Sequence, residues 1–167
     1  AKFTFTGSTG VGKTLLQQCA TTVKKVSMEL GGNAPFIVFD DADIDAAVQG
    51  AMASKYRNAG QTCVCTNRIF VQQGVLSEFT EKFTQAVAAL TVGNGLTDGI
   101  TIGPMISEKA VNDVNSLVAE SVSAGAKVHF GGDKHAAGAR FFQPTILTDV
   151  TNDMPIASNE IFGPVSP

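Results

Sequence analysis

The chain has 167 residues, enough for one compact domain or for parts of two. Hydrophobic residues make up 44% of it and charged residues 16%; a net charge of −3 without a run of lysine or arginine argues against a protein that binds nucleic acid through its charge. No apolar run reaches the roughly 20 residues that span a bilayer, and three cysteines do not make a set of disulfides, so we expect a cytoplasmic protein without membrane contact.

The hydrophobic pattern predicts that strands and helices alternate, which favours an α/β fold with a mainly parallel sheet. The acidic run that ends at Asp43 offers N-cap candidates for the second helix. The last residues, 163–167, bring no closing element, so both ends look cut from a longer protein. Strands are expected over 2–6, 24–29, 35–39, 68–72, 127–130 and 144–150, helices over about 11–21, 43–57, 75–90 and 108–124, and loops over 91–107, 131–140 and from Ile156 onward.

Residues 7–14 read Gly-Ser-Thr-Gly-Val-Gly-Lys-Thr and satisfy the G-x-x-x-x-G-K-[ST] pattern of a phosphate-binding loop, after an expected strand and before an expected helix. A nucleotidase also needs an acid that organises Mg²⁺ at a strand end. The strand that ends at Asp40 and Asp41 is a weak candidate, because it follows the loop closely. Small residues suit any strand–turn–helix junction, so a P-loop nucleotide-binding protein is the alternative hypothesis.

Cys63 lies among small and polar residues, in a loop between an expected helix and an expected strand. An accessible nucleophile would occupy such a place. A buried structural thiol fits the local pattern as well. No spacing of cysteine and histidine indicates a zinc site.

Five segments together resemble the successive signature motifs of the aldehyde dehydrogenase family, in the family's order and spacing. They are 5–9, 29–35, 41–43, 60–63 and 160–165. The resemblance implies a three-layer α/β/α fold with a mainly parallel sheet, truncated at both ends. Residues 1–30 would then end an NAD(P)-binding domain, residues 31–167 would begin a catalytic domain, and the phosphate-loop match would be a family turn.

The resemblance also implies chemical roles. Cys63 is similar to the family's nucleophile, which attacks the aldehyde carbon, and its backbone N–H to one half of an oxyanion hole. Glu29 resembles the base that activates the water for hydrolysis of the thioester. Residues similar to the family's cofactor contacts are Gly7, Ser8, Leu30, Glu160 and Phe162. Four of these residues also have a structural alternative: Ser8 as a turn former, Glu29 as a strand-end acid, Glu160 as a loop acid and Phe162 as a core aromatic.

Two further residues look like those of the family's succinate-semialdehyde branch. Arg57 resembles the residue that holds the far carboxylate of the substrate, a group that a guanidinium binds bidentately; alternatively, it complements a helix C-terminus. Cys65 resembles the partner of the nucleophile in a reversible disulfide; alternatively, it is a packing residue.

The expected activity is NAD(P)-dependent oxidation of an aldehyde, with succinate semialdehyde as substrate and NADP or NAD as cofactor. The expected partner is this small molecule, with no metal, nucleic acid or membrane, and the whole protein is expected to be a homo-oligomer. These 167 residues alone are expected to be inactive, because the family's first cofactor strands and an oxyanion Asn lie upstream. A non-catalytic relative with the same fold remains a further alternative, in which Cys63 would be unreactive toward thiol reagents.

Overall fold

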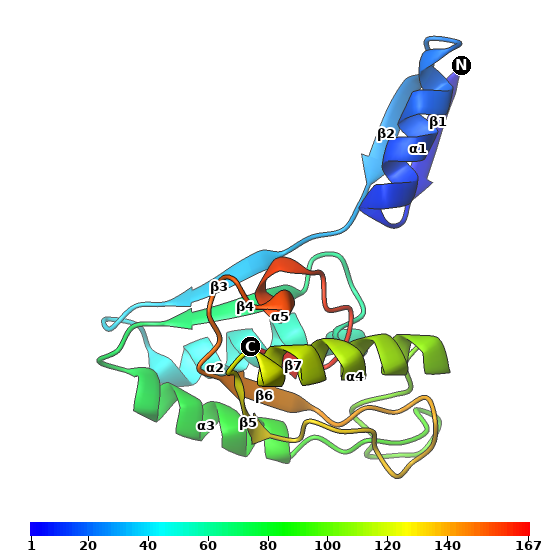
Figure 1. Cartoon of the computed structure of the whole chain (residues 1–167). Coiled ribbons are helices and arrows are strands. Elements are labelled where there is room, and N and C mark those ends of the chain that lie inside the picture. The colour runs from blue at the N-terminus through cyan, green and yellow to red at the C-terminus, as the bar shows by residue number, and fades with distance from the viewer. The chain divides into compact units, whose positions relative to one another are not determined.

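The computed structural model describes all 167 residues and divides them into two compact units, residues 1–32 and residues 33–167 (Figure 1). The division falls directly after the glycine pair Gly31-Gly32. None of the helices has the length and hydrophobicity needed to cross a bilayer.

The first unit is a single strand–helix–strand motif. Its strands β1 (Lys2–Thr6) and β2 (Lys25–Glu29) pair in parallel, and α1 (Thr9–Ala20) connects them. Since the last residues of the two strands pair with each other, the segments that follow β1 and β2 leave the sheet at the same edge.

Close packing in this unit depends on Gly12. Gly12 and Cys19 are the buried residues of α1. A Cβ atom placed on Gly12 would lie 2.5 Å from Cδ2 of Leu30. The glycine therefore lets the helix approach the chain after β2, as small residues do at other helix–strand contacts.

The second unit holds the remaining elements, which follow the predicted alternation closely. They are β3 (Ala34–Val38), α2 (Ile44–Lys55), the 3₁₀ helix η1 (Arg57–Gly60), β4 (Thr66–Val71), α3 (Leu76–Ala88), α4 (Glu108–Ser123), β5 (Lys127–Phe130), β6 (Thr145–Thr148), α5 (Pro155–Ser158) and β7 (Val165–Ser166).

The sheets are mainly parallel, as predicted. β3 pairs with β4 and β6 pairs with β7 in parallel, whereas β5 runs antiparallel to β6. The backbone N–H of Ile69 in β4 donates to the carbonyl of Pro167 (2.9 Å), directly after β7. The prediction of a plain loop from Ile156 onward, without a closing element, was wrong. α5 and β7 are too short to leave a periodic pattern in the sequence.

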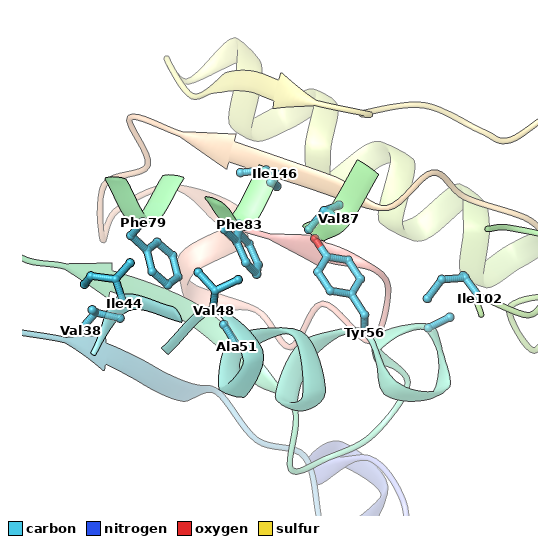
Figure 2. Packing of buried hydrophobic residues seen from close by; sticks show 11 residues of the cluster. Val38, Ile44, Val48, Ala51, Tyr56, Phe79, Phe83, Val87, Ile102 and Ile146 are labelled. Atoms are coloured by element: carbon cyan, nitrogen blue, oxygen red, sulfur yellow. The ribbon is translucent and has the colours of Figure 1, made fainter. Parts of the chain in front are cut away.

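Helices α2 and α3 enclose the larger core of this unit. Phe79 and Phe83 of α3 stack with ring centroids 5.3 Å apart, and Tyr56, after α2, lies 6.1 Å from Phe83 (Figure 2). The Tyr56 hydroxyl donates to the carbonyl of Thr145 (3.0 Å). This core therefore anchors the end of α2, from which the chain continues toward Cys63.

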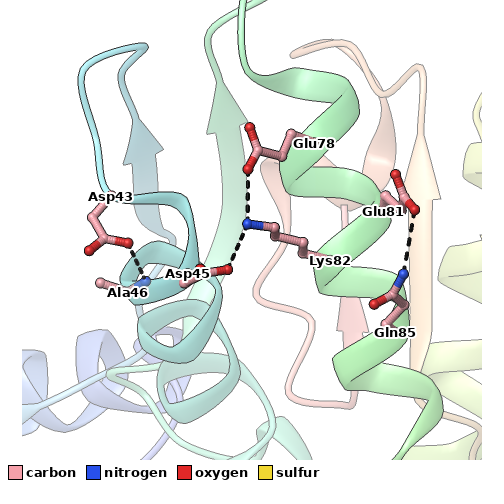
Figure 3. Close-up of polar contacts among 7 residues, drawn as sticks. All are labelled: Asp43, Asp45, Ala46, Glu78, Glu81, Lys82 and Gln85. Carbon is pink, nitrogen blue, oxygen red and sulfur yellow. Dashed lines mark hydrogen bonds and ion pairs between the residues drawn. The ribbon is translucent and has the colours of Figure 1, made fainter.

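Polar contacts secure the outer side of the same helix pair (Figure 3). Asp43 caps α2 by accepting from Ala46 N (3.0 Å), which confirms it as an N-cap. Lys82 of α3 lies 2.7 Å from Asp45 and 2.9 Å from Glu78. These ion pairs are exposed, so their contribution to stability is small.

A second core lies under α4. Its valines pack against the segments that surround residues 160–164, so this cluster holds the last part of the chain in place. The buried residues are Met105, Val111, Val114, Val118, Phe142, Leu147, Ile156, Ile161 and Val165.

Candidate active site

The residues singled out in the sequence fall into two groups, one in each unit. Gly7, Ser8, Glu29 and Leu30 lie in the first unit, where β1 and β2 end. The second unit carries the other five, Arg57, Cys63, Cys65, Glu160 and Phe162. Glu29 and Cys63 thus belong to different units.

The edge of the first unit has the chemistry of an anion site. Gly7 N donates to the carbonyl of Glu29 (3.0 Å), which sets the turn beside that residue. Ser8 caps α1 by accepting from Val11 N (3.4 Å). The first turn of α1 contains no acid, so its N-terminal N–H groups and the helix dipole favour a negative group such as a phosphate. The residues present therefore fit the pyrophosphate of a dinucleotide.

The same edge argues against a P-loop. In a P-loop, a glycine-rich loop surrounds the phosphates before the helix begins. Here α1 begins at Thr9, so Gly10, Gly12 and Lys13 lie inside the helix. The Thr14 hydroxyl donates to the Gly10 carbonyl (3.3 Å), a bond within the helix. The loop that the motif requires is thus helical, and the match is coincidental.

The approach to Cys63 has an unusual backbone. Asn58, Ala59 and Gly60 are left-handed in succession, with φ of 52°, 54° and 74°. Residues other than glycine take this conformation at a cost of about 1–2 kcal/mol each. A Cβ on Gly60 would lie 2.1 Å from the carbonyl oxygen of Gly163. Strain of this kind is typical of functional sites. The missing side chain of Gly60 lets the loop lie directly against Gly163, in the segment that carries Glu160 and Phe162.

Gln61 fixes the loop from the other side. Its Nε2 donates to the Asn58 carbonyl (3.0 Å), and its Oε1 accepts from Ile106 N (2.8 Å). Cys65 N then donates to the Thr62 carbonyl (3.2 Å), which closes a turn around Cys63.

At this turn, Cys63 is exposed and its thiol is free. The backbone N–H of Cys63 donates no hydrogen bond within the chain. Both groups are therefore available, the sulfur as a nucleophile and the N–H as an oxyanion donor.

Cys65 has the opposite environment. It is buried, its Sγ lies 2.8 Å from the Thr62 hydroxyl, and it contacts the carbonyl of Lys55 (3.8 Å). Both cysteines are reduced, so their pairing under oxidation stays a prediction.

Arg57 directly follows Tyr56 and is exposed. Its guanidinium makes no ion pair or side-chain hydrogen bond within the chain. It is six positions from Cys63, at the start of the same loop. A substrate anion could therefore use the whole guanidinium fork.

Glu160 and Phe162 both face outward from the last segment. Phe162 is 43% exposed and left-handed, with φ of 50°. The residues between and after them, Ile161 and Gly163, are buried. This alternation presents the carboxylate and the ring to the surface.

Sequence reasoning missed the residues that support this site. Asn67 of β4, supported by Asn33, makes a hydrogen bond to the segment that carries Glu160. Gln61 makes one that fixes the Cys63 loop. No sequence signal pointed to Asn67, because the predicted strand began at Arg68, whereas β4 begins at Thr66. Its partners could not be read from the chain.

A cavity lies elsewhere in the second unit. It has a volume of about 890 Å³ between α3, β4 and β6, and none of the predicted site residues lines it. The predicted site residues therefore lie outside this cavity.

Comparison with known proteins connects these features. The model of the aldehyde dehydrogenase family matches residues 1–167. A 3-sulfolactaldehyde dehydrogenase of Pseudomonas putida is 60% identical over 99% of this chain, and an NADP(+) succinate-semialdehyde dehydrogenase of Escherichia coli is 58% identical over the same share. The chain spans about a third of these relatives, 34% of each.

Among solved structures, the crystal structure of a succinate-semialdehyde dehydrogenase from Burkholderia pseudomallei superposes with a TM-score of 0.98 at 57% identity. The match covers 99% of this chain and 34% of that one. The fold expected from the sequence is therefore confirmed.

Proposed function

We propose, from the premise that this chain belongs to the aldehyde dehydrogenase family, that the whole protein oxidises an aldehyde to a carboxylate with a nicotinamide cofactor. The observation that carries the proposal is the state of Cys63. Its thiol is exposed and its N–H uncommitted, at a turn that Gln61 and Gly60 fix in place.

In the proposed reaction, the Cys63 thiolate attacks the aldehyde carbon, and a C–S bond forms while the carbonyl oxygen becomes an oxyanion. The Cys63 N–H donates to that oxyanion; one such donor is worth roughly 3–4 kcal/mol. The cofactor, when bound, accepts the hydride. Glu29 then takes a proton from water, whose oxygen attacks the resulting thioester and releases the acid and the Cys63 thiolate.

The proposed cofactor contacts come from the edge of the first unit and from the segment that carries Glu160 and Phe162. Gly7 and Ser8 would meet the pyrophosphate at the start of α1, and Glu160 and Phe162 the nicotinamide ribose and ring. The Leu30 side chain packs on Gly12, so a contact from Leu30 would involve its main chain. Residues 1–30 would end the NAD(P)-binding domain and residues 31–167 begin the catalytic domain. The name of the Escherichia coli relative favours NADP over NAD.

The test measures formation of the reduced cofactor by the whole protein with an aldehyde panel. Cys63→Ala should abolish it. Glu29→Gln should still form a burst of reduced cofactor equal to the enzyme concentration, because acylation precedes hydrolysis. Its steady-state rate should then be lower by about a hundredfold or more. Turnover by Cys63→Ala would end the proposal, and an unchanged steady state in Glu29→Gln would remove Glu29 from it.

For the substrate, we propose an aldehyde that carries an anion at its far end, with succinate semialdehyde as the first choice. Arg57 supplies an exposed guanidinium at the start of the Cys63 loop. The relatives' names support this class. Succinate semialdehyde carries a carboxylate in addition to its aldehyde, and 3-sulfolactaldehyde carries a sulfonate. A guanidinium fork binds either anion.

Arg57→Ala should raise the KM for succinate semialdehyde by about 10- to 100-fold, as expected for loss of hydrogen bonds to a charged group. The KM for an uncharged aldehyde of similar length should stay within about twofold, because that substrate has nothing for Arg57 to bind. Arg140→Ala, which removes an exposed arginine outside the site, is the control. Equal increases for both aldehydes would rule out anion recognition by Arg57.

A further inference from the structure

The backbone around Glu160 is held by one side chain, that of Asn67 in β4. Asn67 is buried, 4% exposed. Its Nδ2 donates to the carbonyl of Asn159 (2.8 Å), and its Oδ1 accepts from the N–H of Ile161 (2.9 Å). The two bonds thus contact the peptide groups on either side of Glu160.

The segment needs such support, because it has no secondary structure of its own. It lies between α5 and β7, and neither a helix nor a strand includes residues 159–164. Phe162 adds a left-handed residue that local preferences do not favour. A donor and an acceptor on one planar amide restrict the rotation of both peptide groups, as a pair of ladder bonds does in a sheet.

Asn33 determines which way the Asn67 amide points. Its Oδ1 accepts from Asn67 Nδ2 (2.7 Å), and its own Nδ2 donates to the carbonyl of Ala157 (3.0 Å). Both N–H groups of the Asn67 amide are therefore used, so a flipped amide would lose all three bonds.

We propose that Asn67 is a positioning residue that fixes Glu160 for the nicotinamide ribose; this rests on the proposed function. Asn67 lies four positions after Cys63, on the strand that the Cys63 turn leads into. β4 therefore follows the Cys63 turn directly and also carries the side chain that holds the backbone on both sides of Glu160.

The test is a double-mutant cycle in the whole protein, with the Kd for NADP as readout. Asn67→Ala should weaken NADP binding about tenfold, the size expected for loss of this hydrogen bonding. In a Glu160→Gln background the same change should have an effect of less than about twofold, because the carboxylate it positions is gone. The rate of Cys63 alkylation by iodoacetamide should stay within about twofold.

Ser121→Ala is the matched control. Ser121 is buried and accepts from Ile156 N (3.1 Å), so its loss removes a comparable bond at α5, just before residues 159–164, without touching the two peptide groups beside Glu160. It should lower the Tm and leave the Kd for NADP unchanged. An equal loss of binding in Ser121→Ala, or fully additive effects in the cycle, would overturn the proposal and leave Asn67 a structural residue.

Two measurements cover the case in which Asn67→Ala does not fold. Asn67→Asp keeps the acceptor for Ile161 and loses the donor, and it should show part of the same Kd change. In the unmutated protein, the amide hydrogen of Ile161 should exchange with solvent as slowly as the amide hydrogens of β4. Fast exchange would contradict a stable hydrogen bond from Ile161 to Asn67. If the unmutated protein binds no dinucleotide, the proposed function fails, while the exchange rate still reports on Asn67.

Discussion

Lys55, in the last turn of α2, is the one charged side chain that is fully buried, with 1% of its surface exposed. Burial lowers its pKa to about 8, and the nearby Cys65 opposes this to a smaller extent. An ammonium in such a place is costly unless it is paired. Lys55 therefore reduces the stability of the segment that delivers Cys63.

Replacing this residue should stabilise the protein. Above its folded pKa of about 8 and below the ordinary 10.5, the unfolded chain binds the extra proton, so the stability of the unmutated protein rises with pH over this range. Below pH 8 the whole penalty is present. Lys55→Met should thus raise the free energy of unfolding at pH 7 by on the order of 3 kcal/mol, and much less near pH 10.

Thermal unfolding at pH 7 and pH 10 measures this difference. Lys109→Met is the control, because Lys109 is exposed and its pair with Asp113 contributes little. A gain of the same size at both pH values, or a loss at pH 7, would contradict the assignment of the cost to burial.

Among the elements, the conformation of the turn between α2 and Cys63 depends most on a glycine at position 60. Gly60 has a left-handed φ of 74°, and a side chain there would meet the carbonyl of Gly163. Gly60→Ala should cost about 1–3 kcal/mol of stability and displace the loop. We expect a lower Tm together with a changed rate of Cys63 alkylation.

Gly95→Ala provides the comparison, since a Cβ at Gly95 would meet nothing within 4 Å. It should leave both measurements unchanged. If Gly60→Ala behaves like Gly95→Ala, the contact with Gly163 is not what shapes the loop.

Element prediction worked where the pattern was long and failed where it was short. The sixteen residues of α4 show one apolar face, and Asp43 marks the start of α2 by its chemistry. α5 and β7 contain too few residues to show a period. The start of α1 had the largest consequence for the function. The helix begins at Thr9, two residues earlier than expected, so the loop that a phosphate-binding motif needs is part of the helix.

At the scale of the whole molecule, the sequence predicted the fold and allowed roles to be proposed for the reactive residues, but it did not predict the residues that support them. Cys63, Glu29 and Glu160 stand in motifs that resemble a family, so their roles could be proposed without coordinates. Asn67 reaches Asn159 across 92 positions, and Gln61 reaches Ile106 across 45. Such pairs arise from tertiary packing, which no local pattern encodes. The meeting of Glu29 with Cys63 stays a prediction.

The cavity between α3, β4 and β6 bears on how the chain behaves in solution. Its walls include aromatic and aliphatic side chains, and Phe70 and Leu76 are 40% and 38% exposed. Exposed apolar surface of this kind is prone to association with other chains. A net charge of −3 gives weak repulsion between copies. At high concentration, the purified chain should self-associate through this cavity. Detergents that cover apolar surface should keep it monomeric.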